Sequence, residues 1–567
     1  MQLLDFLTII IFSLIILVAG LSFGKQGGDM KSFFSAGGAV PWSISGLSLF
    51  MSFFSAGTFV VWGSIAYEWG LVAITIQMAM CISGFLIGAY LAGRWKQTGA
   101  LTVASYLTQR FGKTTQQYYT FIFLLLSLGY TGAFLYPVAK ILNVVTGFDI
   151  YYSILLLGAM IMIYTAVGGL WAVVITDVLQ FVILTAAVLI VLPLSLDKVG
   201  GLHQFIQDAP DTFFHVFNGE YTPWFILAFI GYNTIFIGGN WAYVQRYTSV
   251  KDTLSAKKVG FLFGILYLIS PLIWMLPPMI YRVVNPELVG LETEGAYLRM
   301  CMDVLPVGML GLMLGGMIFA TASSVNTSLN LAAAVLTNDI YQAIFPDSGQ
   351  VVLMRVARTA TLLFGLGTIG VAFMVPLAGG IVEVVLSIGA VTGGALYGPA
   401  IWGLFSRRQT GRSILVVTGI SLLVNLYFKF LSPLLFSISL DRATEMLLGV
   451  FLPLALLGAY EIYALKRNRE SNQYQSYVNR KKPTAKELAA TLTSGEKQNN
   501  FGIKVLGWAF VAIGALLFVL GIGASAGDRY MFAMGACILM MGGTMIYLSR
   551  RRSAGYTINK TEQNIHD

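Results

Sequence analysis

Charged residues are scarce in this sequence of 567 residues. Asp, Glu, Lys and Arg make up 11% of it, hydrophobic residues make up 57%, and the mean hydropathy is +0.76. An ordinary soluble domain carries about 25% charged residues. No globular core can hide this much apolar surface from water, so soluble globular, disordered and collagen-like proteins are excluded. The apolar residues occur in blocks of roughly 20, the length that crosses a bilayer as a helix. The sequence therefore predicts an all-α polytopic membrane protein.

Cysteine and histidine are also rare, with three residues of each type. They are too few and too scattered for a disulfide framework or a Cys/His metal site. The sequence also lacks a nucleophile elbow, a P-loop and a His–carboxylate metal motif, so it does not predict an enzyme. The first apolar block starts at Leu3 without a basic region before it, and we expect a retained helix rather than a signal peptide.

About 15 transmembrane helices are predicted from the apolar segments. Their approximate limits are 3–24, 42–66, 70–93, 117–144, 149–166, 171–196, 222–243, 259–283, 304–335, 353–376, 379–404, 412–434, 443–465, 503–523 and 530–549. The polar stretch 466–502 between two of them has the composition of a cytoplasmic linker. The last two segments contain almost no polar residue, and we expect a peripheral role for them.

The basic residues predict the orientation of these segments. If the N-terminus is outside, 28 of the 35 Lys and Arg residues lie in inner loops and five lie in outer loops. Inner loops of membrane proteins are enriched in Lys and Arg. We therefore expect a multi-pass protein of the plasma (inner) membrane with a cytoplasmic C-terminus. The net charge of +9 reflects this topology, and we expect no nucleic-acid partner.

Two segments carry glycine and polar residues in mid-membrane, where helices are easily interrupted. One contains residues 53–58 (FFSAGT), and the other contains residues 231–233 (GYN) and 238–240 (GGN). Unwound helices supply free backbone groups for ions and substrates, and two interruptions five segments apart are typical of an inverted five-helix repeat. For residues 53–58 alone, close packing of helices through small residues is the simpler explanation.

Residues 320–328 (ATASSVNTS) form the densest polar cluster within a span. Six of these nine residues carry a hydroxyl or an amide. A hard cation such as sodium needs several oxygen ligands, and the Ser323 and Ser324 hydroxyls with the Ala320 carbonyl would supply three. The alternative is that the hydroxyls bond back to their own helix. The density of the cluster favours the functional interpretation.

Asp177 lies well inside the sixth segment, with no basic residue nearby in the sequence. An acid within a membrane span is costly and is a functional candidate by default. A structural carboxylate near the inner interface is an equally good interpretation.

Residues 164–172 (YTAVGGLWA) and 176–180 (TDVLQ) together form a specific pattern. It resembles the sodium:solute symporter family, which includes sodium/glucose, sodium/proline and sodium/sialic acid cotransporters. The similarity runs from about residue 5 to 465. Further matches are residues 55–58 (SAGT), Gln245-Arg246, Asn330, residues 338–341 (NDIY), and residues 403–405 (GLF) before Arg407-Arg408.

The resemblance implies a LeuT-type fold, which is a ten-helix inverted repeat with extra helices. The domains expected from it are 1–41 (an extra N-terminal helix and the first inner loop), 42–404 (the transport core), 405–465 (two additional helices), 466–502 (the linker) and 503–567 (two C-terminal helices and a basic tail).

The resemblance also implies a sodium site between the first and eighth core helices. Carried over to this sequence, its ligands are Met51, Phe54, Ala320, Ser323 and Ser324, with the first three acting through backbone carbonyls. Some members of the family hold another sodium ion at positions that match Asp177 and Thr327. Asn326 stands where those members have serine.

Substrate contacts in the family map to Ser55, Thr58, Gln77, Asn233, Phe236 and Tyr267. This uncharged set favours a neutral sugar or polyol over a carboxylate or an amino acid, which remain the alternatives. We therefore expect a sodium-coupled symporter that acts in the lipid bilayer as a monomer, with sodium and a small solute as its ligands. A transporter-like sensor is the competing class.

Overall fold

The computed structural model describes residues 2–22, 38, 40–100, 102–164, 170–479, 485–524 and 527–566. Within these ranges all regular structure is helical, apart from one isolated bridge between Val40 and Val250. The prediction of an all-α protein is confirmed for this part of the chain. Residues 165–169, which include the glycine pair 168–169 between the predicted segments 149–166 and 171–196, lie outside the described residues.

Among the described residues, 11 helices are long and apolar enough to cross a membrane, and a bent pair would make 12. Three shorter apolar helices occupy three more of the predicted segments. The exact count of 15 spans stays a prediction. The main helices are α1 (Leu3–Leu21), α5 (Leu71–Leu86), α8 (Lys113–Thr146), α9 (Ile150–Tyr164), α10 (Leu170–Lys198), α14 (Thr253–Trp274), α17 (Met309–Ala334), α19 (Gln350–Met374), α20 (Ile381–Trp402), α21 (Gly411–Leu426), α23 (Arg442–Lys466), α25 (Ala485–Ile522) and α26 (Asp528–His566).

The extra N-terminal helix α1 is fastened to α17 by a buried carboxylate. Asp5 accepts hydrogen bonds from the backbone N–H groups of Gly308 at 2.6 Å and Gly311 at 3.2 Å. A Cβ on Gly311 would lie 2.1 Å from the Asp5 carbonyl oxygen, so only glycine allows this close approach. An acid within the first span is therefore explained by helix packing.

The first core helix is broken where the sequence predicts it. Helix α3 (Trp42–Met51) ends before a non-helical turn, and the chain continues through the π-helical η2 (Thr58–Trp62) into α4 (Gly63–Trp69). The Thr58 hydroxyl donates to the Phe53 carbonyl and accepts from the Ser55 N–H, at 3.2 Å in the latter case. Side-chain bonds thus replace the backbone ladder through the break.

The second predicted break is also confirmed. Helices α12 (Pro223–Gly239) and α13 (Trp241–Thr248) meet at Asn240 with a bend of 65°. The Asn240 side chain caps the new helix by accepting from the Ala242 N–H at 3.0 Å. A Cβ on Gly239 would lie 2.8 Å from the Tyr397 side chain, so the bend also brings α12 close against α20.

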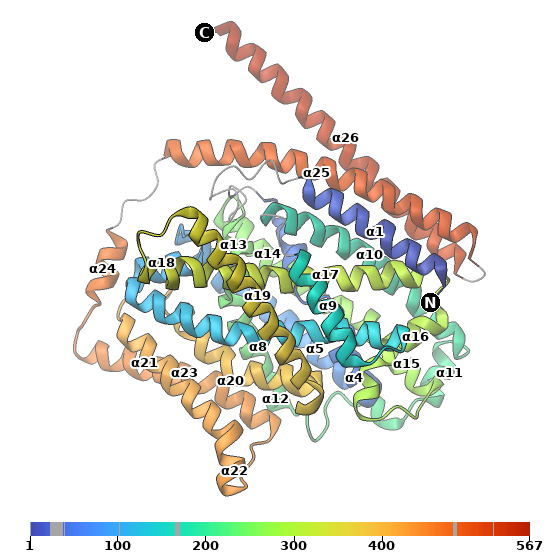
Figure 1. Cartoon of the computed structure of the whole chain (residues 1–567), viewed down its shortest axis with the longest axis horizontal. Helices are drawn as coiled ribbons and strands as arrows, with labels where there is room; N and C mark the ends of the chain where they lie inside the picture. The colour runs from blue at the N-terminus through green and yellow to red at the C-terminus, as the bar shows by residue number, and fades with distance from the viewer. Residues whose placement is uncertain are drawn as a thin grey trace.

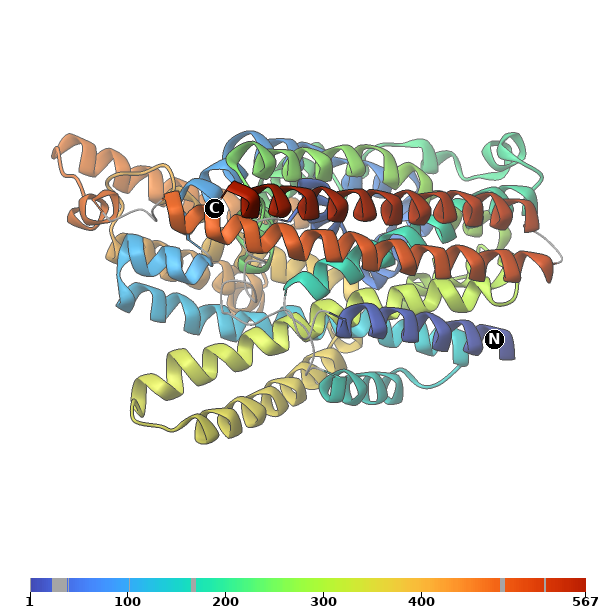
Figure 2. The ribbon, with the colours of Figure 1, turned by 90° about the horizontal axis from the view of Figure 1, so that it is seen from above.

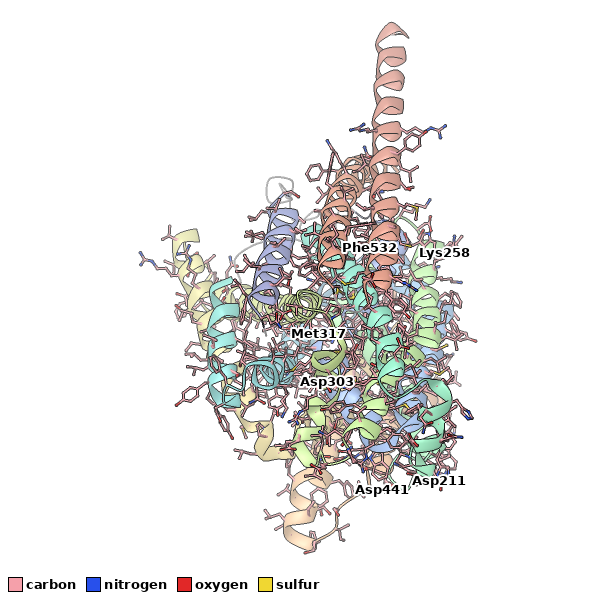
Figure 3. The ribbon with its side chains drawn as sticks, turned by 90° about the vertical axis from the view of Figure 1, so that its right-hand side faces the viewer. Asp211, Lys258, Asp303, Met317, Asp441 and Phe532 are labelled. Atoms are coloured by element: carbon pink, nitrogen blue, oxygen red, sulfur yellow. The ribbon has the colours of Figure 1, made fainter. Side chains whose placement is uncertain are left out.

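The loops gather at two opposite ends of the molecule (Figure 1). The N-terminus, α11 (Leu202–Asp208), α15 (Leu276–Val284) and α16 (Ala296–Val304) lie at one end, which faces the viewer in Figure 3. Helices α18 (Gln342–Ile344) and α24 (Asn472–Val478) lie at the other end. This division agrees with the loops that the basic residues assign to the outside and the inside, and the absolute orientation stays a prediction.

The polar stretch 466–502, which the sequence predicts to be a cytoplasmic linker, is partly helical. It contains α24, and α25 already begins at Ala485. Helix α24 is held by tertiary contacts, because the Gln473 amide donates to the Phe111 carbonyl at 2.9 Å and accepts from the Gly411 N–H at 3.0 Å. Helices α25 and α26 pack along each other (Figure 2) and meet the rest of the protein mainly through α1 and α10.

Candidate functional site

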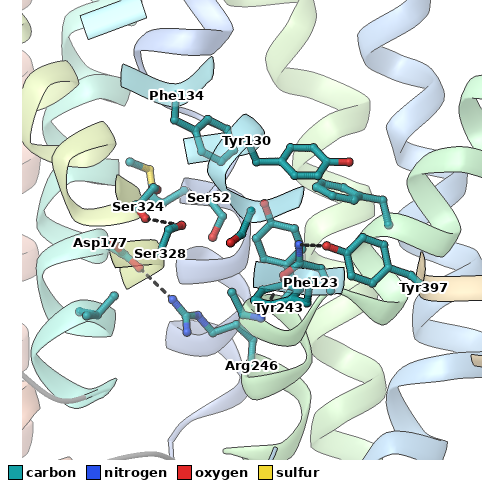
Figure 4. A pocket seen from close by; sticks show the side chains of 16 residues that line it. Ser52, Phe123, Tyr130, Phe134, Asp177, Tyr243, Arg246, Ser324, Ser328 and Tyr397 are labelled. Carbon is teal, nitrogen blue, oxygen red and sulfur yellow. Dashed lines mark hydrogen bonds and ion pairs between the residues drawn. The ribbon is translucent and has the colours of Figure 1, made fainter. Parts of the chain in front are cut away.

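A cavity of about 80 Å³ lies between the two broken helices and α8, α10, α17 and α20 (Figure 4). Hydroxyl, amide and aromatic side chains dominate its lining. The described lining residues with such side chains are Ser52, Phe123, Ser127, Tyr130, Phe134, Phe236, Asn240, Tyr243, Ser324, Ser328 and Tyr397. The two charged residues among the described lining residues are Asp177 and Arg246.

Asp177 and Arg246 form a buried ion pair at one side of the cavity. Arg246 Nη2 lies 3.6 Å from Asp177 Oδ2. The Ser48 hydroxyl donates to the same Asp177 oxygen at 2.5 Å and accepts from Arg246 Nε at 2.9 Å. A buried charge without a partner is strongly unfavourable, and this arrangement supplies both a counter-charge and hydrogen bonds. The partner of Asp177 is distant in the sequence and comes from α13.

The structure brings together the two helices expected to hold sodium. The Ala56 N–H, within the break of the first core helix, donates to Thr321 Oγ1 of α17 at 3.1 Å. Met51 and Ser324 both line the cavity. Phe54 and Ala320, which lie within one helical turn of these residues in the sequence, are buried. The side chains of Ser323 and Thr327 lie outside the described residues. The Ser324 hydroxyl is 3.5 Å from the Ala320 carbonyl, which is a weak bond to its own helix and leaves its oxygen available to another ligand.

The expected substrate residues are only partly brought together. Phe236 lines the cavity, with its ring centroid 5.5 Å from that of Tyr130 and 5.6 Å from that of Tyr397. The other five expected residues are buried but do not line this cavity. They are Ser55, Thr58, Gln77, Asn233 and Tyr267.

Three of these five have distinct surroundings. Tyr267 packs against Phe50 at a centroid distance of 5.2 Å, and the Asn233 amide donates to the Phe229 carbonyl at 2.9 Å. Both side chains are thus accounted for by packing and helix bonding. Gln77 is fully buried, and neither polar atom of its amide has a hydrogen-bond partner among the described residues. Buried amides are nearly always hydrogen bonded, so Gln77 is the member of the set that still needs a partner.

Several cavity residues were missed from the sequence. The Asn240 amide donates to the Tyr397 hydroxyl at 3.1 Å, and the Tyr130 hydroxyl is 2.5 Å from Thr392 Oγ1. Asn240 could have been found, because it stands within the helix-breaking run of residues 238–240. Nothing in the sequence distinguishes Tyr130 from the aromatic residues of α8 that face elsewhere.

At the end of the core that carries α15 and α16, the short helix η5 (Gly290–Gly295) packs on the broken first core helix through Thr293. The Thr293 hydroxyl donates to Glu68 Oε1 at 2.9 Å and lies 2.6 Å from the Ser64 hydroxyl. Both partners belong to α4. Thr293 therefore ties η5 to the second half of the first core helix.

The neighbouring residue, Glu294, binds a different set of helices. Its carboxylate lies 3.6 Å from Lys140 Nζ and accepts a hydrogen bond from the Tyr136 hydroxyl at 2.9 Å, and both residues belong to α8. It also accepts from the Ile381 N–H at the start of α20 at 2.9 Å. We call Thr293 and Glu294, with these partners, the outer junction. It ties α4 to α8 and α20 at the end of the molecule opposite α18 and α24.

Known proteins resemble this chain along most of its length. The model of the sodium:solute symporter family matches residues 33–418. The human sodium/iodide cotransporter is 28% identical over 443 residues, which cover 74% of this chain and 68% of the relative. The sodium/glucose cotransporter of Vibrio parahaemolyticus is 27% identical over 476 residues, which cover 76% and 86% respectively.

A solved structure of a Na⁺-coupled sialic acid symporter has the same fold. It superposes with a TM-score of 0.68 at 21% sequence identity and covers 83% of this chain and 99% of its own. The likeness confirms the expected LeuT-type architecture.

The chain belongs to the sodium:solute symporter family. It is therefore a multi-pass membrane transporter rather than an enzyme, and its activity is sodium-coupled symport of a solute. Sodium acts in this family as the coupled ion rather than as a resident cofactor.

Proposed function

We propose that this protein couples the inward movement of sodium to the uptake of a neutral polyhydroxy solute, such as a sugar or a polyol. The composition of the cavity carries this proposal. Hydroxyls, an amide and aromatic faces line it, and the two charges among its described lining residues neutralise each other. Hydroxyl-rich neutral molecules are recognised by groups of this kind, whereas an anion needs an uncompensated cation.

Sodium binds, in this proposal, between the first and eighth core helices. The ligands are the carbonyls of Met51, Phe54 and Ala320 and the hydroxyls of Ser323 and Ser324. The Ala56–Thr321 hydrogen bond, which fastens the break of the first helix to α17, supports this site because it holds the two ligand sets at the same level. A second sodium at Asp177 and Thr327 is less well supported, because Asp177 already has Arg246 as its counter-charge.

Transport proceeds by alternating access around this site. Sodium enters from outside and joins the two helices, the solute then binds, the outer side closes, and both ligands leave towards the cytoplasm. Motions of this kind are largely rigid-body movements of one helix bundle against another. The outer junction joins α4 to α8 and α20, so we propose that it breaks when the outer side opens and reforms when it closes.

The driving force is sufficient for concentrative uptake. One charge that crosses 100 mV releases about 2.3 kcal/mol, and a tenfold sodium gradient adds about 1.4 kcal/mol. Together, roughly 3.7 kcal/mol per sodium ion sustains a solute gradient of about 500-fold.

A carboxylate or an amino acid is the second candidate for the solute. One observation favours it, because Arg246 lines the cavity and could exchange part of its interaction with Asp177 for a substrate carboxylate. The relatives transport anions such as iodide in one case and the neutral sugar glucose in another. For either solute we place the protein in the plasma (inner) membrane as a monomer, with the N-terminus outside, residues 42–404 as the core and the C-terminus in the cytoplasm.

Thermal unfolding of the detergent-purified protein tests the solute class. The measurement is made in sodium and in potassium with sugars, polyols, amino acids and carboxylates, since a ligand that binds the folded state raises the melting temperature. A rise with a sugar or polyol in sodium only supports the proposal. A rise with carboxylates or amino acids replaces the neutral solute by the second candidate. If sodium changes no ligand's effect, the proposed sodium site is wrong.

A further inference from the structure

An apolar groove runs between α1 and α25 on the outside of the helix bundle. Its volume is about 430 Å³, and side chains of both helices line it. Leu14, Val18 and Trp508 stand beside it and are each more than half exposed in the protein alone, at 54%, 66% and 54%. In a membrane such side chains face lipid, so this groove is a place where a lipid chain can lie against the protein.

The groove extends through half of the bilayer. Its lining on α25 runs from Phe501 to Ala512, and its lining on α1 runs from Leu14 to Ser22. At about 1.5 Å per residue these stretches are about 17 Å and 12 Å long. The hydrocarbon core of a bilayer is about 30 Å thick. The stretch on α1 ends at Ser22, directly after the end of that helix. The stretch on α25 begins at Phe501, within the helix and close to the end of the polar stretch 466–502. Both positions adjoin segments that the basic residues assign to the inside, so the groove belongs to the leaflet that we propose to be cytoplasmic.

The lining of the groove has the polarity of a lipid. Its two polar residues, Ser22 and Lys504, lie near the same end, and the other lining residues are apolar. A molecule with a hydrocarbon chain and a charged headgroup matches this division, and a partner helix is an outcome of the test below.

The mouth of the groove is basic. Lys504 is the charged residue among the described lining residues, and it stands one turn from the inner end of the groove. Reciprocal hydrogen bonds of 3.3 Å between Asn500 and Ser549 place a middle turn of α26 next to the residue that precedes Phe501, at the same end of the groove. Arg550 and Arg551 follow directly and are exposed. Basic pockets between transmembrane helices on the cytoplasmic side bind the headgroups of anionic lipids.

We propose that this groove binds one anionic glycerophospholipid, with an acyl chain between α1 and α25 and its phosphate at Lys504, Arg550 and Arg551. The lipid fills the groove between the extra N-terminal helix α1 and the C-terminal helix α25. This gives the last two helices a role as part of a lipid site. The inference uses the proposed orientation only to assign the leaflet, and it is independent of the transported solute.

Thermal unfolding of the full-length protein in detergent tests the site without sodium or solute. Phosphatidylglycerol and phosphatidylcholine with identical acyl chains are the probes. We expect phosphatidylglycerol to raise the melting temperature by at least about 2 °C more than phosphatidylcholine. K504Q, and the triple variant K504Q/R550Q/R551Q, lose this difference. K251Q, which removes an exposed lysine of another inner loop, keeps it.

A second variant tests the acyl chain. Ala512 lines the groove and is exposed, so Ala512→Trp fills it and should reduce the effect of both lipids. Native mass spectrometry should show one phosphatidylglycerol retained by the wild type and none by A512W. Equal effects of the two lipids, or a preference for phosphatidylglycerol that K504Q leaves intact, would overturn the proposal. A dimer that A512W dissociates would show that a second copy covers the groove instead.

Discussion

Arg246 Nη2 lies 3.6 Å from Asp177 Oδ2, although 69 positions separate the two residues in the chain. The bend at Asn240 makes this contact possible, because α13 starts in a new direction and turns Arg246 towards α10. The same bend opens the cavity. The broken helix therefore both builds the candidate site and neutralises the acid beside it.

The ion pair predicts that Asp177→Asn destabilises the protein even without sodium. The substitution leaves Arg246 buried without a counter-charge, and breaking a buried pair in this way costs about 3–5 kcal/mol. Thermal unfolding of the purified protein in potassium buffer should show a clearly lower melting temperature. The double variant D177N/R246Q, which removes both charges, should lie closer to the wild type.

Asp303→Asn serves as the control for this prediction, because it breaks an exposed pair with Lys198 and should change stability little. An unchanged melting temperature of Asp177→Asn in potassium would contradict the account. If this variant is as stable as the wild type in potassium but gains nothing from sodium, Asp177 is a sodium ligand rather than the partner of Arg246.

Ser324→Ala should weaken the apparent affinity for sodium by at least about tenfold, which corresponds to about 1.4 kcal/mol. The substitution removes one oxygen ligand of the proposed site and breaks only a weak intrahelical bond of 3.5 Å. Sodium titration of uptake, or of the melting temperature, measures the effect. Ser328→Ala, one turn away on the same helix, should change it less. Unchanged sodium affinity in the Ser324 variant would refute the site.

Gln77 lies outside the cavity lining, but in this proposal the solute supplies the partner that its buried amide lacks. Gln77→Leu should therefore lower solute affinity without lowering stability. Both polar atoms of the Gln77 amide are buried without a partner among the described residues, and replacing such a group by an apolar one of similar size is neutral or stabilising. Solute titration of uptake and thermal unfolding are measured on the same preparation. A loss of stability with normal affinity would mean that Gln77 has a structural partner and no contact with the solute.

Glu294→Gln should favour the outward-open state, because it removes the charge that holds Lys140 at the outer junction. Residues of the outer junction also line a second cavity of about 400 Å³, which we call the outer vestibule and which includes Ile65, Glu220 and Arg442. Ile65 is only 2% exposed, so a cysteine introduced there reports opening. In a C537S parent, I65C should react with an external thiol reagent roughly tenfold faster when Glu294→Gln is present, as expected for a shift of about 1.4 kcal/mol.

Glu220→Gln is the matched control for the outer junction. Glu220 lines the same vestibule but pairs with Arg442 at 2.8 Å instead of with the junction. This variant should leave the labelling rate unchanged. Equal acceleration by both variants would mean that negative charge in the vestibule, rather than the junction, controls access.

Most of the fold could be predicted from the sequence. Apolar runs of membrane-spanning length gave the helices, and residues 53–58 and 238–240 marked the two breaks, because glycine and polar side chains offer the backbone other partners. The cytoplasmic linker 466–502 stays a prediction, and the structure adds that it is partly helical, with α24 and the start of α25. Polar composition alone does not predict these helices, because the contacts that hold α24, such as that between Gln473 and Phe111, come from distant parts of the chain.

The candidate site was less predictable, for a physical reason. In the middle of α8, over residues 121–139, most positions are apolar or aromatic, so periodicity cannot distinguish the face of Tyr130, which lines the cavity, from faces that meet lipid or other helices. The partner of Asp177 was missed because only the bend at Asn240 brings Arg246 to it. The resemblance to known symporters placed Tyr267 among the substrate contacts, whereas in the structure its ring packs against Phe50 outside the cavity lining. The ligand sets of the sodium and solute sites stay predictions.

Uptake into proteoliposomes that contain only this protein tests the central claim most directly. A labelled sugar or polyol, chosen from the thermal unfolding panel, is offered outside under an inward sodium gradient, with an inward potassium gradient as the control. The account predicts accumulation above the outside concentration in sodium alone, increased by an inside-negative potential and reduced in Ser324→Ala. Equal uptake in potassium, or accumulation that does not respond to the membrane potential, would contradict sodium-coupled symport through the proposed site.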